Sequence, residues 1–124
     1  MSKILIAEDE VLMLKALEFK LKKDGYQVDV ASDGRQAMEK VKNGTYDLIL
    51  TDIMMPFVGG MEILSYIKND PIKKSTPVLL ISAVGLENVV LEGFNLGADD
   101  FIYKPFNLNE LSVRVKRYIK QNAF

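Results

Sequence analysis

The sequence predicts an α/β fold in which one parallel five-stranded sheet is covered by helices on both faces. Short apolar runs alternate with longer stretches of helical periodicity along the whole chain. Continuous apolar runs are typical of strands buried on both faces, and regular alternation with right-handed crossovers places helices on both sides of the sheet. No linker, repeat or low-complexity tract interrupts the pattern, so we expect one domain over residues 1–124. The predicted strands are 3–7, 27–31, 47–51, 77–82 and 101–103.

The helical stretches carry their own start and stop signals. Asp33 with Gln36 three residues later is typical of a capped helix start and predicts a helix over 34–43. Asn107 with Glu110 opens the last helix in the same way. Glycines between a helical stretch and a strand are typical of helix ends. They stand at Gly25, Gly44 and Gly97.

Composition limits the chemistry that the chain can perform. Cysteine and histidine are both absent, which excludes thiolate and imidazole metal sites and catalysis by Ser-His-Asp or Cys-His groups. The 16 basic and 17 acidic residues give a net charge of -1, so no overall charge attracts nucleic acid or an anionic membrane. No apolar run approaches the roughly 20 residues of a membrane span, and the apolar run within the start "MSKILIAEDE" is too short for a signal peptide. We expect a cytoplasmic protein that binds neither nucleic acid nor membrane directly.

Polar residues stand at the end of four of the five predicted strands or directly after it. Because the carboxyl ends of parallel strands meet at one edge of a sheet, these side chains are expected to converge there. Carboxylates about 5 Å apart repel each other by roughly 3 kcal/mol per pair at an effective dielectric of ~20. One lysine offsets one charge, and an all-oxygen ligand set suits Mg²⁺, with Mn²⁺ as the alternative. The sequence therefore predicts a divalent cation site and, beyond it, a phosphoryl group, formed by Glu8, Asp9, Asp52, Ser82 and Lys104.

Each of these residues taken alone has a simpler explanation. An Asp after a strand, such as Asp9, is usually a helix cap or a turn former. Ser82 fits a capping hydroxyl, Lys104 a solvated surface lysine and Pro56 a turn residue. The joint pattern favours a site, because independent caps need not follow four strands of one alternating fold.

With these residues placed, the sequence resembles the receiver domains of two-component response regulators, a family that includes the chemotaxis response regulators. The resemblance covers residues 3–121 and rests on "ILIAEDE", "DLILTDIMMP", "GG" at 59–60, "LLISA" and "GADDFIYKPF", in that order. It implies a doubly wound (βα)5 flavodoxin-like fold with strand order 2-1-3-4-5. It also implies transfer of a phosphoryl group from a sensor histidine kinase or a histidine phosphotransfer protein. Such a domain is not a conventional enzyme, but it catalyses its own phosphorylation and a slow autodephosphorylation.

The resemblance implies a phosphoacceptor and a metal site. Asp52 matches the aspartate that becomes phosphorylated, and Glu8 and Asp9 match the acidic pair that holds Mg²⁺ together with it. Asp9 is the expected direct ligand of that pair. The backbone carbonyl of Met54 is expected to be a further ligand.

The resemblance also implies a switch. Ser82 matches the residue whose hydroxyl bonds the phosphoryl group, and Lys104 matches the lysine that pairs with it. The bond from Lys104 to Pro105 is typically cis. Phe101 matches the aromatic switch residue, which turns inward when Ser82 is drawn toward the phosphate. Asp52, Lys104 and Ser82 are thus the expected catalytic residues.

Four residues depart from the family's usual pattern. Glu8 stands where Asp is more frequent, so its longer side chain is expected to reach the metal through water. Met54 and Val84 are apolar where the family often has polar side chains that affect hydrolysis. We therefore predict a long-lived phosphorylated form, which its half-life at neutral pH with Mg²⁺ tests. Phe101 lacks the hydroxyl of the common Tyr, so the switch is expected to work through packing alone.

The stretch 86–96 indicates where the output surface lies. Its apolar residues cover more than half a helical wheel, which exceeds the stripe that packing on the sheet requires. The resemblance to receivers of DNA-binding regulators implies a homodimer or effector face built from this stretch, the strand 101–103 and the last helix. Scattered exposed apolar residues explain the pattern equally well. The interface candidates are Val89, Val90, Asp100, Val113 and Arg114.

Several alternatives compete with this interpretation. A flavin mononucleotide-binding flavodoxin would need a phosphate loop where "AEDEVLM" stands, and a haloacid-dehalogenase-type phosphatase would want an acid at Met54. A pseudo-receiver, an interaction module without phosphorylation, is the remaining alternative, and absence of Mg²⁺ binding would support it. The effector is either a separate downstream partner or a C-terminal output domain, because the ending "YIKQNAF" fits both.

Overall fold

The computed structural model describes residues 1–83 and 87–122, with side chains described as far as Ile119. Five parallel strands form one sheet in the order β2-β1-β3-β4-β5, as the sequence predicts. Two of them, β2 and β5, are therefore edge strands, and β1, β3 and β4 have a neighbour on each side. The strands are β1 (Lys3–Ala7), β2 (Gln27–Ala31), β3 (Leu48–Asp52), β4 (Val78–Ala83) and β5 (Asp100–Lys104).

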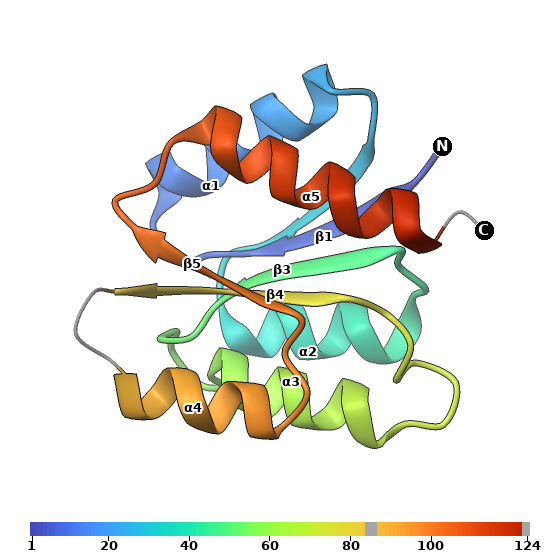
Figure 1. Ribbon diagram of the computed structural model, residues 1–124, viewed down its shortest axis with the longest axis vertical. Helices are drawn as coiled ribbons and strands as arrows, with labels where there is room; N and C mark the ends of the chain where they lie inside the picture. The colour runs from blue at the N-terminus through green and yellow to red at the C-terminus, as the bar shows by residue number, and fades with distance from the viewer. Residues whose placement is uncertain (84–86, 123–124) are drawn as a thin grey trace.

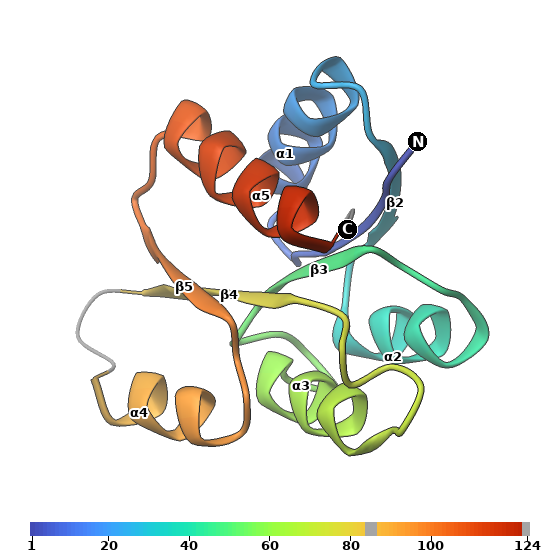
Figure 2. The same cartoon turned by 45° about the vertical axis from the view of Figure 1, so that its right-hand side comes forward.

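Five helices cover the two faces of the sheet. Two of them, α1 and α5, lie on one face, and α2, α3 and α4 lie on the other (Figure 1, Figure 2). Every connection between consecutive strands contains a helix, so the fold is a doubly wound α/β domain. The helices are α1 (Val11–Lys23), α2 (Gly34–Asn43), α3 (Gly60–Asn69), α4 (Glu87–Asn95) and α5 (Leu108–Asn122).

Alternation along the central strands divides the core into two layers. Ile4 and Ile6 of β1 pack toward α1 and α5, whereas Leu5 and Ala7 pack toward the other three helices. Both sets are fully buried, which explains why the strand reads as one continuous apolar run. Burial on both faces also leaves only the strand ends for polar side chains.

The helix ends follow the sequence signals with one difference in detail. Asp33 Oδ1 accepts a hydrogen bond from the Gln36 N–H at 2.8 Å and caps α2. The Gln36 side chain returns to the N–H of Ser32, one residue before the cap, at 3.0 Å. Asn107 caps α5 in the same manner, because its Oδ1 accepts from the Asn109 N–H at 2.7 Å.

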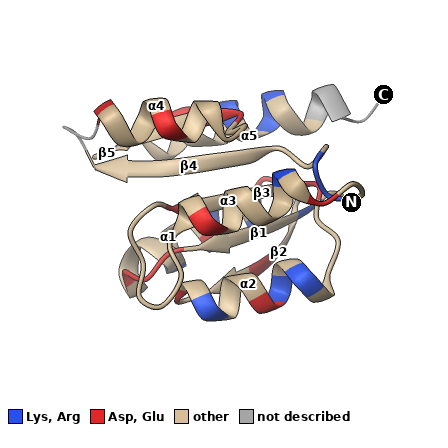
Figure 3. Cartoon of the chain, turned by 90° about the horizontal axis from the view of Figure 1, so that it is seen from below, with Lys and Arg blue, Asp and Glu red and all other residues tan. Residues whose placement is uncertain are grey.

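Charged residues of both signs are distributed over the helices. On α2 acidic and basic positions are interspersed along the exposed side (Figure 3). This agrees with the net charge of -1 of the whole chain. Among residues 1–83 and 87–122, no helix has both the length and the apolar character needed to span a bilayer.

Candidate functional site

Three carboxylates converge at the carboxyl edge of the sheet. β1 and β3 are paired so that Ala7 lies opposite Thr51, which brings the residues after each strand together. One carboxylate oxygen from each of Glu8, Asp9 and Asp52 lies within 4.8 Å of the others. Glu8 and Asp52 are buried and Asp9 is exposed, so the cluster opens to solvent on one side. The convergence predicted from the strand ends is present in the structure.

Lys104 provides the positive charge of this cluster. Its Nζ lies 2.9 Å from Asp52 Oδ2 and 3.0 Å from an oxygen of both Glu8 and Glu10. Burial alone would lower the pKa of Lys104, but the carboxylates of Asp52, Glu8 and Glu10 outweigh burial and raise it. The side chain is therefore an ammonium throughout the physiological pH range.

Glu10 is a member of the site that sequence reasoning missed. It is exposed, and its Oε1 accepts a hydrogen bond from Lys104 Nζ. The signal was present, because the run "EDE" places a third acid directly after the pair Glu8 and Asp9. Its contact with Lys104 joins residues far apart in the sequence, and no local pattern reveals such a pairing.

Glu8 is the most strongly buried acid in the cluster. Its Oε1 lies close to Lys104 Nζ, yet the angle does not make a hydrogen bond, and that oxygen has no hydrogen-bond partner among the described residues. Burial, followed by the neighbouring Asp52, raises the pKa of Glu8 to about 7. A buried carboxylate oxygen without a hydrogen bond is costly unless another group uses it.

The donor set fits a hard divalent cation. Carboxylate oxygens from Glu8, Asp9 and Asp52 gather around one point, and Mg²⁺ prefers such oxygens while it keeps positions for water and phosphate. Lys104 pairs with Glu8 and Asp52, and the carboxylate of Asp9 is added to this pairing, so negative charge exceeds positive charge among the described residues at the edge even before Glu10 is counted. Glu8 Oε1 lies 3.0 Å from Lys104 Nζ but accepts no hydrogen bond from the described residues, which is consistent with the same fit.

The turn after β3 fixes the orientation of Asp52. Thr51 Oγ1 donates to the Asp52 carbonyl at 3.0 Å, and the Met54 N–H approaches Asp52 Oδ1 at 3.4 Å. The Gly60 N–H donates to the Ile53 carbonyl at 2.9 Å, so α3 begins directly beneath this turn. A Cβ at Gly60 would stand 2.3 Å from the Asp52 carbonyl oxygen, which explains the glycine at this position.

Ser82 and Phe101 lie on neighbouring strands next to this edge. Asp52 is paired with Ile81, so Ser82 lies one position further toward the site, where it is buried and donates from Oγ to the Ala83 carbonyl at 3.1 Å. Phe101 is also buried, and the Lys104–Pro105 bond is cis as expected. Val84, the second apolar position named above, lies outside the described residues.

Phe101 is packed beneath α4. Its ring centroid lies 4.8 Å from that of Phe94. A Cβ at Gly93 would stand 2.4 Å from the Phe101 ring, so α4 can approach this closely only with glycine there. The ring therefore occupies an inward position and is coupled to α4 through direct contact.

The interface candidates divide into buried and exposed residues. Val90 is only 8% exposed and belongs to the core, and Val89 is half-buried. This corrects the placement of Val90 on an outer face, because α4 turns that side chain toward the sheet. Leu91 at 62% and Phe94 at 50% exposed carry the apolar surface of α4 instead, and Val113 of α5 is 68% exposed.

Asp100 and Arg114 pair with each other within the chain. Arg114 Nη1 lies 3.0 Å from Asp100 Oδ2 and donates to the Phe101 carbonyl at 3.2 Å. A second nitrogen of Arg114 lies 3.3 Å from Glu110. The pair thus joins β5 to α5, and any contact with a second chain would have to share or replace these bonds.

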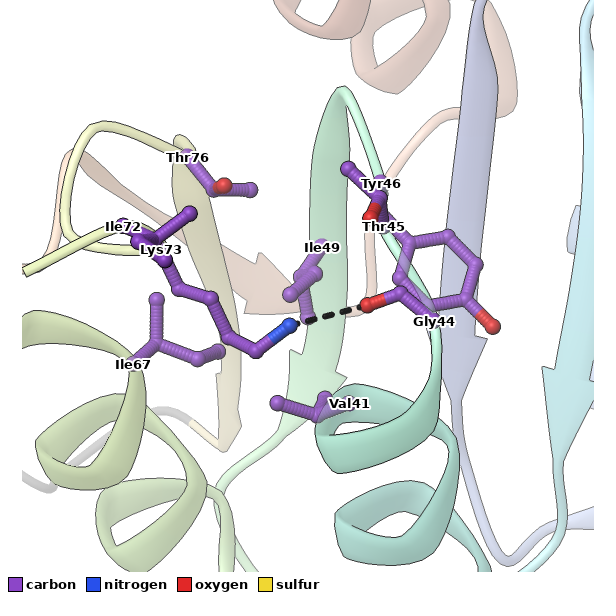
Figure 4. A pocket seen from close by; sticks show the side chains of 9 residues that line it. All are labelled: Val41, Gly44, Thr45, Tyr46, Ile49, Ile67, Ile72, Lys73 and Thr76. Atoms are coloured by element: carbon purple, nitrogen blue, oxygen red, sulfur yellow. Dashed lines mark hydrogen bonds between the residues drawn. The ribbon is translucent and has the colours of Figure 1, made fainter. Parts of the chain in front are cut away.

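A small cavity lies at the opposite end of β3. Lys73 reaches across it and donates from Nζ to the Gly44 carbonyl at 2.9 Å (Figure 4). Its lining is largely apolar, with Val41 of α2, Ile49 of β3 and Ile67 of α3. Its volume of about 50 Å³ is far below that of an ordinary ligand pocket. This cavity is a feature of helix packing and is separate from the acidic edge.

Comparisons with known proteins identify the family of this fold. The response regulator receiver domain family matches residues 4–116. The response regulator ArlR of Staphylococcus saprophyticus is 38% identical over 121 residues, which are 98% of this chain and 54% of that protein. The transcriptional regulatory protein ResD of Bacillus subtilis is 38% identical over 97% of this chain and 49% of its own. The chain thus spans about half the length of these curated relatives.

Solved structures give the same result. The Francisella response regulator 1452 receiver domain has a TM-score of 0.89 at 31% identity, covering 98% of this chain and 99% of that one. The receiver domain of sensor histidine kinase PA1611 from Pseudomonas aeruginosa, solved with a magnesium ion coordinated in its active site cleft, has a TM-score of 0.86 at 28% identity, covering 96% and 98%. With the family match over most of its length and relatives this similar, the chain belongs to the response regulator receiver domains of two-component signalling.

Proposed function

We propose that this receiver domain accepts a phosphoryl group on Asp52 in the presence of a divalent cation. The observation that carries the proposal is the convergence of Glu8, Asp9 and Asp52 oxygens within 4.8 Å, with Lys104 Nζ 2.9 Å from Asp52. The donor is a phosphohistidine on a sensor kinase or a phosphotransfer protein. The chain has no histidine of its own to serve as that donor.

The chemistry is a direct transfer to a carboxylate. An Asp52 oxygen attacks the phosphorus, a new P–O bond forms, and the P–N bond to the donor imidazole breaks, which leaves an aspartyl phosphate. Such a transfer requires positioning and neutralisation of charge more than covalent assistance. Lys104 holds its ammonium beside Asp52 and can pair with the incoming phosphoryl oxygens.

Glu8, Asp9, Asp52 and the backbone carbonyl of Met54 are the residues that would hold Mg²⁺. When bound, the ion supplies positive charge next to the transferring phosphoryl oxygens. The Pseudomonas receiver domain with coordinated magnesium supports this assignment by likeness. Mn²⁺ prefers the same oxygen ligands and is the alternative ion.

Phosphorylation then changes the surface through Ser82 and Phe101. The phosphoryl group adds nearly two negative charges and three strong acceptors, which can draw the Ser82 hydroxyl toward Asp52. Phe101 lies one strand further along and contacts α4, so a shift of this ring alters the face formed by α4, β5 and α5. We assign to that face the binding of an effector, an output domain or a second copy of the domain.

Incubation with acetyl phosphate and Mg²⁺, followed by intact mass measurement, tests the proposal. We expect the wild type to gain about 80 Da, the mass of one phosphoryl group, and Asp52→Asn to gain none. Asp47→Asn is a matched control, because Asp47 lies at the opposite end of β3 and accepts from the Lys3 N–H. If neither acetyl phosphate nor a phosphohistidine donor modifies the wild type, the domain is a pseudo-receiver that acts by binding alone.

A further inference from the structure

The turn after β3 contains a bulky residue in a strained backbone conformation. Phe57 has a φ of 72°, in the left-handed region that non-glycine residues rarely adopt. Its neighbours close a tight turn around it, since the Val58 N–H donates to the Pro56 carbonyl at 2.9 Å. The Phe57 side chain is 69% exposed, so burial in the core does not hold it there. Some other contact must maintain the conformation.

The first turn of α2 supplies that contact. The Gly34 N–H donates to the Pro56 carbonyl at 3.2 Å. A Cβ at Gly34 would stand 1.6 Å from the Val58 carbonyl oxygen, so the two backbones are directly apposed. Over this junction the guanidinium carbon of Arg35 lies 4.2 Å from the centre of the Phe57 ring. A guanidinium at this distance from an aromatic face is attracted by the ring.

The clamped turn is the segment that leads away from Asp52. Met54 approaches Asp52 Oδ1 through its N–H, and its carbonyl is one of the proposed metal ligands. Only Met55 separates Met54 from Pro56, whose carbonyl accepts from both Val58 and Gly34. Release of Phe57 to an ordinary negative φ would redirect this short segment and move the Met54 carbonyl with it.

We propose that Arg35 is a positioning residue for the metal site. By stacking on Phe57 it holds the strained turn after β3 in the conformation that presents the Met54 carbonyl beside Asp52. Arg35 itself touches neither metal nor phosphoryl group. This inference rests on the proposed function, because it assigns to Arg35 a part in the same site.

Calorimetric titration of Mg²⁺ alone into the metal-free domain tests the inference. We expect Arg35→Ala to weaken Mg²⁺ binding by about two- to fivefold, the range that an exposed cation–π contact supports. Phe57→Leu keeps a Cβ, and with it the energetic cost of a positive φ, but removes the ring that Arg35 holds, so the same loss is expected. Arg35→Lys keeps a cation over the ring and should recover part of the affinity.

A matched control separates positioning from a general loss of helix contacts. Lys42 lies on the same helix with its Nζ 5.5 Å from the centre of the Tyr66 ring, away from the turn. Lys42→Ala should therefore leave the Mg²⁺ dissociation constant unchanged. In phosphorylation by acetyl phosphate, Arg35→Ala should raise the Mg²⁺ concentration for half-maximal rate and leave the rate at saturating Mg²⁺ unchanged.

Unchanged Mg²⁺ affinity in Arg35→Ala, with or without a lower melting temperature, would overturn the inference, because Arg35 would then be structural at most. A wild type that does not bind Mg²⁺ would instead overturn the proposed metal site. In that event hydrogen exchange of the metal-free protein decides about Arg35. Faster exchange over residues 53–58 in Arg35→Ala and Phe57→Leu, but not in Lys42→Ala, supports the clamp, and equal exchange refutes it.

Discussion

At the scale of single residues, the burial of Glu8 determines how readily its carboxylate ionises. Its carboxylate is fully buried beside Asp52, and in the described part of the chain the ammonium of Lys104 is the one cation paired with both. Burial removes this carboxylate from water, and the neighbouring Asp52 adds to the effect, so the pKa of Glu8 is raised. The buried carboxylates of Glu8 and Asp52 therefore destabilise the metal-free domain when both are ionised, and a bound cation would offset this repulsion.

Glu8 should make the stability of the metal-free domain fall as pH rises. The pKa of Glu8 is near its ordinary value of 4.5 in the unfolded chain and is raised to about 7 in the folded one. The folded state thus holds this proton more tightly, and its stabilising effect is present below pH 4.5 and lost through pH 7. Relative to Glu8→Gln, we expect the wild type to lose on the order of 3 kcal/mol of unfolding free energy over this range.

Urea denaturation of both proteins between pH 4.5 and pH 8 measures this difference. The comparison with Glu8→Gln cancels the titration of the other acids, which both proteins share. Added Mg²⁺ at the upper end of the range should restore the wild type more than the variant, because a cation binds the ionised carboxylate. If the unfolding free energies of the wild type and Glu8→Gln differ by the same amount at every pH, Lys104 already neutralises the negative charge of Glu8 in full.

At the scale of secondary-structure elements, the start of α3 sets the end of β3. Gly60 lets α3 begin close to the end of β3. The Asp52 carbonyl oxygen lies where the Cβ of any other residue at position 60 would be. The contact is with backbone atoms, which cannot rotate away as a flexible side chain can. The position of Asp52 therefore depends on the absence of a Cβ eight residues later.

Gly60→Ala should destabilise the domain and disturb Asp52. An added methyl group would stand 2.3 Å from the Asp52 carbonyl oxygen, and forcing it in should lower the unfolding free energy by about 1–3 kcal/mol. Gly59→Ala is the control, because a Cβ there would meet only the Ile53 carbonyl oxygen at 3.1 Å. Chemical denaturation and the phosphorylation rate of the two variants check this. Equal stability of the two would mean that α3 adjusts without moving β3.

The elements themselves are largely predictable from the sequence, and their exact ends are less so. The run 47–51 was expected to form a strand, and the structure extends it to Asp52, because Asp52 remains in register with Ile81 of β4. Likewise β5 begins at Asp100 and ends at Lys104, since β4 supplies partners at both positions. Strand ends depend on the neighbouring strand, and an apolar run does not contain that information.

The contacts that sequence reasoning missed are those between distant elements. Glu10 contacts Lys104, and Arg35 contacts Phe57, although the residues of each pair are far apart in the sequence. No local sequence pattern predicts either contact. The burial of Val90 was missed for a related reason. A helix with apolar residues on most of its faces does not reveal which face meets the sheet, and only packing decides it.

At the scale of the whole molecule, one side of the domain carries exposed apolar side chains from three elements. β5 is an edge strand, with α4 on one flank and α5 on the other (Figure 2). These three elements carry the exposed side chains of Tyr103 (β5), Leu91 and Phe94 (α4), and Val113 (α5). Phe94 also touches Phe101, so this surface is in direct contact with the residue proposed to move on phosphorylation.

This side should mediate dimer formation by the phosphorylated domain. In a two-fold symmetric dimer each substitution occurs twice, so Val113→Asp would bury two carboxylates in an apolar contact and oppose association. Ile72→Asp is the matched control, because Ile72 is 88% exposed and lies in the segment before β4, beside the cavity lined by α2 and α3. Sedimentation velocity after treatment with acetyl phosphate and Mg²⁺ should give dimers for the wild type and Ile72→Asp and monomers for Val113→Asp.

Intact mass must show the same phosphorylation in all three, since a variant that fails to accept the phosphoryl group reports on the site and not on the surface. Dimers of equal strength in Val113→Asp would place the interface elsewhere, and a phosphorylated wild type that stays monomeric would leave this side to an effector or an output domain.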